Sequence, residues 1–560
     1  MVSEPHYFIT AALPYANGPL HFGHLAGVYL PADIYYRHTV LLDRKAVFIS
    51  GSDEHGVAIT LSAEKDGKGY QEYVDEYYNK HQEVFRAYNI EFSYYGRTSS
   101  KFHKQIAQEY FLELQKKNVL VAEECEQPFC PNCNKHIPDR YVGGICSNCE
   151  YEQARGDECP QCGKWLSFKE LKEPFCQICK QTGVSVKKET QWFLDLPKLA
   201  PKLKKWLLGR DNWKKGVLNF ALSLIESGLP KRAITRNIAW GIDVPGEEET
   251  GKKLYVWFEA PIAYFSMLRE YFESKKQPSG WKSFWNSDAK IIHFIGKDNI
   301  VFHTIVWPAM LLGLESGVLP TNVPANMYVQ LKGKQFSKTS KWSLDAMEAI
   351  SQFGEDSLRF YLTTIIPEQS DSEFSWEGFG SRVNGELVNN LANFCNRILS
   401  LVKKNLSNAI EASEFQHLFS QSAIKAVNSR GEKMRFYLDN FEFRKALEEV
   451  LCLGNDANKF CNDEEPWKVL KLDSEKGRQI LTANLVYLIG LGTLLKPFLP
   501  NYASKVCSIF PNINFKEIYG GNFSIETFKY PIQLNLEINL AIPRIPSEVL
   551  NEKIDSLSHV

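Results

Sequence analysis

The feature that most constrains this chain is a series of four Cys-x-x-Cys pairs between residues 130 and 179. They hold eight of the thirteen cysteines. Such pairs, set in short turn-rich segments, suit tetrahedral thiolate coordination, whereas cysteines so close in sequence make poor structural disulfides. We therefore expect two zinc sites, each held by four thiolates. The pairs are Cys130/Cys133, Cys146/Cys149, Cys159/Cys162 and Cys176/Cys179.

Composition argues against a membrane span but leaves a nucleic-acid partner open. The chain has 560 residues and a formal net charge of -1. Its strongest apolar run, LVYLIGLGTLL from Leu485, is shorter than the roughly 20 residues that a span needs, and predicts a buried helix. The N-terminus has no basic stretch leading into a long apolar one, so we expect a cytoplasmic protein. A lysine-rich segment from Pro197 fits either a solvated helix face or a phosphate-facing one.

Short β-rich runs alternate with helical stretches on both sides of the cysteine region. This alternation predicts a Rossmann-like α/β catalytic domain with a parallel sheet, split by the zinc-binding insertion, whose ligand site lies at the carboxyl ends of the strands. After about Asp345 the spacing becomes helical and predicts a C-terminal α-helical bundle. The expected strands are residues 7–14, 45–51, 253–260, 290–298 and 325–333, and the expected helices include 23–38, 71–88 and 302–314.

The stretch AALPYANGPLHFGH, residues 11–24, combines a turn with two histidines at the start of a predicted helix. Backbone N–H groups and the helix dipole make such a turn an anion site. His21 and His24 can face the same side, and Gly23 lets a nucleotide lie close. Taken alone, the two histidines also fit a structural or metal-binding role. The loop FSKTSK, residues 336–341, favours the phosphate-binding interpretation, because a loop lysine with neighbouring hydroxyls suits a pyrophosphate leaving group.

With both motifs in one split sheet, the chain resembles the class I aminoacyl-tRNA synthetases, and within them the methionyl-tRNA synthetase family. The two signatures stand here as HFGH, residues 21–24, and QFSKT, residues 335–339. The resemblance covers nearly the whole chain and includes the four cysteine pairs. Its further motifs are AALPYANG, SDEHG from Ser52, YVWFEAPIAY from Tyr255, HFIGKD from His293, FHTIVWPAML from Phe302 and DANKFCNDEEPW from Asp456.

The chain departs from the family pattern at three positions. Gln335 replaces the first signature lysine, with Lys334 one place earlier, and Phe336 replaces methionine. Asn299 stands where many bacterial relatives have an aliphatic residue.

The resemblance implies a role for each matching residue. His21, Gly23, His24 and Lys338 would bind ATP, with both histidines and the lysine acting in catalysis, and Mg²⁺ would accompany the nucleotide. Asp53 would anchor the substrate ammonium, and Arg236 and Asp298 would lie near the substrates. An aromatic and aliphatic cage suits the long, polarizable methionine side chain. Its expected members are Ala12, Leu13, Pro14, Tyr15, Trp257, Ala260, Pro261, Tyr264, Phe302 and His303.

The resemblance also implies a nested zinc arrangement and an anticodon site. One ion would be shared by Cys146, Cys149, Cys159 and Cys162, and the other by the outer pairs, although sequential pairing is not excluded by the sequence. With four thiolates each, both sites would be structural, with at least one filled. The anticodon readers would be Asn393, Arg397 and Trp467.

These motifs imply a methionine--tRNA ligase that uses L-methionine, ATP and tRNA(Met) and acts as a monomer away from membranes. Two rivals are another amino-acid specificity, which would need a larger editing insertion, and a zinc-ribbon RNA-binding protein with a degenerate nucleotide site. The expected divisions are 1–118 and 230–325 for the two catalytic halves, 119–229 for the insertion, 326–380 for the signature-loop and stem-contact region, and 381–560 for the anticodon-binding bundle.

Overall fold

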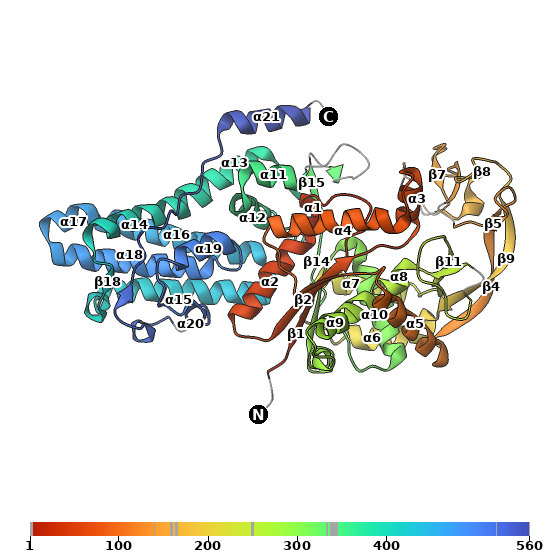
Figure 1. The fold of residues 1–560 in the computed structure, drawn as a ribbon, viewed down its shortest axis with the longest axis horizontal. Helices are drawn as coiled ribbons and strands as arrows, with labels where there is room; N and C mark the ends of the chain where they lie inside the picture. Colours follow the sequence, from red (N-terminus) through yellow and green to blue (C-terminus); the bar gives the residue numbers. More distant parts are fainter. Residues whose placement is uncertain are drawn as a thin grey trace.

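The computed structural model places a parallel sheet at the centre, the cysteine-rich insertion at one end and the helical bundle at the other (Figure 1). Among the residues described, no helix combines the length and apolarity that crossing a membrane requires. The described residues are 4–138, 141–156, 159, 161–162, 166–247, 251–331, 334–335, 345–521 and 523–558.

The central sheet has five parallel strands in the order β14-β13-β1-β2-β3. β13 pairs with β1 although the whole insertion separates them in sequence, which confirms the predicted split sheet. Neighbouring residues of β1 face opposite sides, so that Phe8 and Ile9 enter two different apolar cores. The strands are β1 (Tyr7–Ala11), β2 (Ala46–Ser52), β3 (Tyr94–Arg97), β13 (Lys290–Gly296) and β14 (Ala325–Asn326).

Helices cover both faces of this sheet (Figure 1). The helix that carries the two histidines begins at Phe22, passes through a π-helical turn and continues to Leu41. These helices are α1 (Phe22–His24), η1 (Leu25–Tyr29), α2 (Leu30–Leu41), α3 (Val57–Lys65), α4 (Tyr70–Ala87), α5 (Lys101–Lys116), α9 (Ile262–Ser274), η7 (Phe302–Val306) and α10 (Trp307–Leu314).

Two of the predicted strands are wrong in extent. Residues 253–260 do not form one strand, because β12 (Lys252–Leu254), which pairs with β11 (Thr235–Asn237), ends at Leu254 and helix α8 (Val256–Glu259) follows. A short apolar run has the same pattern in a buried strand and a buried helical turn. Residues 325–333 divide between β14 of the central sheet and β15 (Val329–Leu331), which pairs with β16 (Lys334–Gln335) and β17 (Ser372–Phe374).

The insertion is built on a long antiparallel pair, β4 (Leu120–Cys130) and β9 (Ser185–Leu194). The cysteine-rich segments extend from the far end of this pair, and two helices return the chain to the sheet (Figure 1). The remaining elements are β5 (Lys135–His136), β6 (Val142–Ile145), β7 (Ala154–Arg155), η3 (Phe168–Glu170), β8 (Lys172–Cys176), α6 (Leu196–Leu207), α7 (Lys215–Glu226) and β10 (Arg232–Ala233).

The C-terminal region is helical, as predicted, and the apolar run from Leu485 lies buried within α18. The last helix, α21, leaves the bundle and lies beside α13, where Leu550 contacts Gly380. The main helices are α11 (Ala346–Phe353), α12 (Glu355–Thr364), α13 (Trp376–Arg382), η8 (Val383–Ala392), α14 (Asn393–Asn405), α15 (Leu418–Asp439), α16 (Phe443–Glu464), α17 (Pro466–Leu472), α18 (Ser474–Leu494), α19 (Pro500–Cys507), α20 (Phe515–Tyr519) and α21 (Ser547–Ser558).

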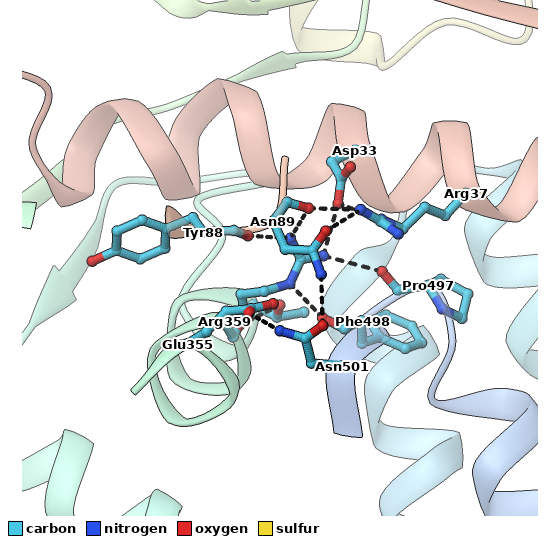
Figure 2. A network of polar contacts seen from close by, with 10 residues as sticks. Asp33, Arg37, Tyr88, Asn89, Glu355, Arg359, Pro497, Phe498 and Asn501 are labelled. Atoms are coloured by element: carbon cyan, nitrogen blue, oxygen red, sulfur yellow. Dashed lines mark hydrogen bonds and ion pairs between the residues drawn. The ribbon is translucent and has the colours of Figure 1, made fainter. Parts of the chain in front are cut away.

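A fully buried arginine, Arg359 of α12, joins the sheet region to the bundle (Figure 2). Its guanidinium is 2.8 Å from a carboxylate oxygen of Asp33 on α2, and it donates to the carbonyl oxygen of Tyr88 at 2.8 Å. From the bundle side it donates to the carbonyl oxygens of Phe498 at 2.8 Å and Pro497 at 3.3 Å. Arg359 is therefore a desolvated cation whose partners come from both regions.

Candidate active site

A cavity of about 350 Å³ opens where the central strands end. It collects nearly all of the residues that the sequence assigns to methionine and ATP. Those that line it are Ala12, Leu13, Pro14, Tyr15, His21, Gly23, His24, Asp53, Trp257, Ala260, Pro261, Tyr264, Asp298, Asn299, Phe302 and His303.

Backbone hydrogen bonds fix the turn after β1 at one wall of the cavity. The amide of Ala12 donates to the carbonyl oxygen of Phe294 at 2.9 Å. The amide of Asp53 donates to the carbonyl oxygen of Pro14, and the amide of Ala16 donates to that of Asp53, both at 2.9 Å. The chain leaving β1 is thus held against the chain leaving β2, so Tyr15 and Asp53 are presented side by side.

The two histidines lie together at the helix start. Their rings stack with centroids 3.8 Å apart and an interplanar angle of 29°. The backbone amide of His21 donates to Nδ1 of His24 at 3.2 Å. Phe22 between them is buried, with its ring 4.8 Å from that of Phe374. This packing aims both imidazoles into the same cavity, beside the helix N-terminus that favours anions.

Aromatic rings form the apolar part of the cavity. Trp257 and Phe302 stack almost parallel, at 3.8 Å and 9°, and Tyr15 meets Trp257 edge-on at 5.9 Å. Trp257 is on helix α8 and Phe302 begins the π-helical turn η7. The two segments lie on either side of β13 in the sequence, and together they make one wall of the cavity.

A series of buried hydrogen bonds forms another part of the cavity wall. The hydroxyl of Tyr264 is 2.8 Å from Nε2 of His303, whose Nδ1 is 2.9 Å from the carbonyl oxygen of Asn299. Burial lowers the pKa of His303 to about 4, only partly opposed by the Asn299 carbonyl. The ring is therefore neutral near pH 7, with Nδ1 donating to Asn299 and Nε2 accepting from Tyr264. Asn299 contributes through its backbone, which makes this contact independent of its side chain.

Asp53 presents a buried carboxylate to the same space. It is 3% exposed, and its Oδ1 has no hydrogen-bond partner among the described residues. Burial, and then the nearby charge of Glu259, raise the pKa of Asp53 well above its usual range. Glu259 is itself buried, within 3.0 Å of Nδ1 of His55 and 2.8 Å of Nε2 of His103. A cation that reaches Asp53 would satisfy the open oxygen.

Sequence analysis missed part of the lining near the histidines. Met327 and Tyr328 follow β14, and the carboxyl end of a parallel strand is the signal that could have found them. Their backbone amides donate to the carbonyl oxygen of Pro367 at 2.8 Å and to Oδ1 of Asp371 at 2.9 Å. The complete set of missed lining residues is Gly27, Val28, Tyr29, Gly296, Met327, Tyr328 and Val329.

One predicted residue, Arg236, is not among the residues that line this cavity, and a second, Lys338, lies outside the described residues, as does the rest of the FSKTSK loop. The guanidinium of Arg236 lies over the ring of Tyr255 at 4.3 Å and donates to the carbonyl oxygen of Thr235.

The eight paired cysteines form two clusters in the nested arrangement. In each cluster the four sulfur atoms lie within 4.8 Å of one another. The closest contacts between pairs are 3.6 Å for Cys130–Cys179 and 3.6 Å for Cys149–Cys159. A zinc–sulfur bond of about 2.3 Å implies tetrahedral edges of about 3.8 Å, so both clusters fit a zinc ion. The clusters are Cys130, Cys133, Cys176 and Cys179, and Cys146, Cys149, Cys159 and Cys162.

The predicted anticodon residues are on α14 and α17, which lie at the end of the bundle remote from the sheet (Figure 1). Asn393 and Arg397 are one turn apart on α14, and Asn393 is exposed. The guanidinium of Arg397 lies 5.9 Å from the ring centroid of Trp467 and donates to Asn458 and Asn462. The group offers an aromatic face, a cation and amides to an unstacked base.

Comparison with known proteins identifies two matching family models. Residues 7–399 match the model described as tRNA synthetases class I (M), and residues 416–517 match the anticodon binding domain of methionyl tRNA ligase. The chain is 39% identical to the methionine--tRNA ligase of Rubrobacter xylanophilus over 520 residues, which cover 90% of each protein. It is also 40% identical to the enzyme of that name from Flavobacterium johnsoniae, covering 93% of this chain and 74% of the relative.

Solved structures share the same fold. The methionyl-tRNA synthetase of Mycobacterium tuberculosis in complex with methionyl-adenylate superposes with a TM-score of 0.79, over 96% of this chain and 100% of that chain. Sequence identity in that comparison is 21%. At that level the match supports the arrangement of sheet, insertion and bundle.

Proposed function

The chain belongs to the class I tRNA synthetase (M) family, and from this premise we propose that it activates L-methionine with ATP and charges tRNA(Met) with the product. The observation that supports the proposal best is the cavity. It sets an aromatic cage, an open carboxylate oxygen of Asp53 and two stacked histidines around one space. A zwitterionic, apolar amino acid and a polyphosphate need those three surfaces side by side.

Methionine would occupy the aromatic part of the cavity. Its ammonium would bind Asp53, and its thioether would lie among Trp257, Phe302 and the Tyr264–His303 pair. Sulfur next to ring edges is a favourable contact. Because His303 is neutral and already paired on both ring nitrogens, it adds no charge that would repel an apolar side chain.

ATP would lie against the histidine side of the cavity. In the first step a carboxylate oxygen of methionine bonds to the α-phosphorus, and the bond from that phosphorus to pyrophosphate breaks. His21 and His24 would hold the phosphates, Lys338 would meet the charge that develops on pyrophosphate, and Mg²⁺ would neutralise part of the phosphate charge. Asp298, which lines the cavity, and Arg236 are proposed as further groups near the substrates.

In the second step a ribose hydroxyl at the 3′ end of tRNA attacks the methionyl carbonyl carbon, and AMP leaves with the bonding electrons. The protein supplies no covalent nucleophile in this scheme, because orientation and charge stabilisation account for such transfers. Anticodon reading is proposed for Asn393, Arg397 and Trp467 in the bundle, here taken as residues 381–560. Residues 326–380 would contact the stem, and the active form would be a cytoplasmic monomer.

We propose that both cysteine clusters hold zinc in a structural role. Four thiolates close the coordination shell and leave no position for water or substrate. The apolar core of the insertion, which includes cysteines of both clusters, packs against Val57 and Leu61 of α3, so loss of the metal ions would loosen the helix that follows Asp53. Replacing Cys130 with serine should release one zinc and leave the ion held by Cys146, as measured by metal analysis. Loss of both ions together would argue against two independent nested sites.

Methionine-dependent exchange of labelled pyrophosphate into ATP tests the function. The purified protein should catalyse exchange with L-methionine and far more slowly with leucine, isoleucine or valine. Exchange with one of those three instead would support another specificity. No exchange from protein shown to bind RNA would support the zinc-ribbon binding protein.

A further inference from the structure

Lys214, in the lysine-rich segment, directs its ammonium group to acceptors within the protein. Nζ of Lys214 lies 3.3 Å from the carbonyl oxygen of Ala325, 3.0 Å from Oδ1 of Asn326 and 3.1 Å from the carbonyl oxygen of Glu368. Its sequence neighbour Lys215 is exposed. The predicted choice between a solvated and a phosphate-facing segment therefore does not apply to Lys214.

Lys214 joins three regions that are distant in sequence. It comes from the insertion, Ala325 and Asn326 form the edge strand β14, and Glu368 lies between the sheet and the bundle. Adjacent contacts strengthen the joint, because Nε1 of Trp213 donates to the carbonyl oxygen of Thr321 at 2.7 Å. The insertion is thus fastened along the segment that leads into β14.

Two of the three partners of Lys214, Asn326 and Glu368, lead directly to the cavity. Nδ2 of Asn326 donates to the carbonyl oxygen of Gly27 at 2.8 Å, and Gly27 is in the π-helical turn that follows His24. The carbonyl oxygen of Pro367, next to Glu368, accepts from the amide of Met327 at 2.8 Å. Gly27 and Met327 both line the cavity on the histidine side.

The charge state of Lys214 determines how many hydrogen bonds it can donate to these partners. Three acceptors face it, and only an ammonium has three N–H donors for them. Burial lowers the pKa of Lys214 to about 8, opposed by the charges of Glu368 and Glu442. The other charged groups of this junction are Arg444, whose amide donates to Glu368, and Lys445, which pairs with Glu442.

We propose that Lys214 is a positioning residue for ATP: it holds β14 and the 367–368 segment so that Gly27 and Met327 shape the nucleotide side of the cavity. This inference rests on the proposed function. Lys214 contacts neither substrate in this scheme. Its loss should let Asn326 and Pro367 shift while the aromatic cage, which shares none of these contacts, stays in place.

The test measures KM for ATP and for methionine in pyrophosphate exchange, using the full chain with Lys214→Met. Lys215→Met is the matched control, since it removes the same charge one residue away. We expect KM for ATP to rise about tenfold in Lys214→Met, with KM for methionine changed by less than about twofold. The control should match the wild type in both values.

Equal rises in both KM values, or no rise in either, would overturn the proposal, because a merely structural role would not single out ATP. If Lys214→Met does not fold by circular dichroism, Lys214→Gln is assessed by the same criteria, since its amide keeps two N–H donors. An inactive wild-type protein would instead contradict the proposed function, so the two failures are distinguishable.

Discussion

The two sides of the cavity are built in different ways. The proposed methionine side consists of partly buried rings and the buried carboxyl group of Asp53, carried by the sheet and its covering helices, with Trp257 and Phe302 stacked on each other. The proposed ATP side depends on contacts from two regions outside the central sheet: Lys214 of the insertion, and Pro367 and Asp371 before the bundle. The first is preorganised, whereas the second is complete only when several regions are in place.

This difference suggests that amino-acid recognition and nucleotide positioning can be impaired separately. A substitution among the rings should change methionine affinity alone. A substitution at Lys214 or at the segments that it contacts should change ATP affinity or the rate of methionine activation. The predictions below test that separation, beginning with the largest expected effect.

Lys338→Ala should reduce the rate of adenylate formation by about 100- to 1,000-fold with little change in methionine affinity, because the lysine would act on charge that develops only in the transition state. Single-turnover adenylate formation and methionine binding measure the two quantities. Lys341→Ala, in the same loop, is the control and should cost far less. Comparable losses of rate and affinity would mean that the lysine supports the fold of the site.

Asp53→Asn should weaken methionine binding by about 100-fold and leave KM for ATP nearly unchanged, since a buried ammonium would lose its anionic partner. Calorimetric titration with methionine measures this. An analogue of methionine without the amino group should bind the variant and the wild type alike. Glu270→Gln, a half-buried carboxyl group on α9, is the control. A matching loss for the deaminated analogue would contradict the assignment of Asp53 to the ammonium.

Phe302→Ala should raise KM for methionine about tenfold, because it removes the ring stacked on Trp257 and opens the cage. KM for ATP should stay within about twofold of the wild type. Phe302→Leu, which keeps apolar volume, should recover part of the affinity. A rise in KM for ATP of the same size would show that the two sides of the cavity are not separable.

The smallest effects are expected from changes in pH. Raising the pH should weaken ATP binding, whereas lowering it should weaken methionine binding. Above about pH 8 Lys214 loses its proton and one hydrogen bond, so KM for ATP should rise a few-fold between pH 7 and about 9. On the acid side Asp53, whose pKa is raised by burial, becomes protonated and methionine affinity should fall. KM for ATP, measured across this pH range in the wild type and in Lys214→Met, tests the role of Lys214. A rise in KM at alkaline pH that persists in the variant would exclude Lys214 as its source.

Neutral His303 also links folding to pH. Its pKa is about 4 in the folded protein against an ordinary 6.5, so the unfolded chain binds the proton more readily. The stability contributed by the neutral ring is present above pH 6.5 and is lost as pH falls toward 4. The unfolding midpoint should therefore be lower at pH 5 than at pH 7. His303→Gln, which cannot protonate in this range, should reduce the difference between the two midpoints.

Much of the fold and of the candidate site could be predicted from sequence because those features depend on local patterns. The split sheet follows from the two sets of strand and helix, and the metal clusters from cysteine spacing. The cage residues were found by matching motifs, which single out Trp257 and Tyr264 where composition alone would place them in the core.

The remainder depends on contacts between distant segments, which no local pattern reports. Glu259 belongs to a stretch that reads as a strand but forms a helical turn, and its two histidine partners come from other elements. Met327 becomes a lining residue only because β14 ends beside the histidine helix. The π-helical turns that carry Gly27 and Phe302 have the composition of ordinary helices.

The buried guanidinium of Arg359 limits which helical bundles could replace the bundle of this chain. A chimera that kept residues up to about 380 and received a bundle from another protein would need carbonyl groups at the positions of Pro497 and Phe498. Without them the buried guanidinium would keep Asp33 and Tyr88 as partners but lose two acceptors, at a cost of about 1–3 kcal/mol for each. A transplanted bundle is therefore expected to be stable only if it brings carbonyl acceptors to the same two positions.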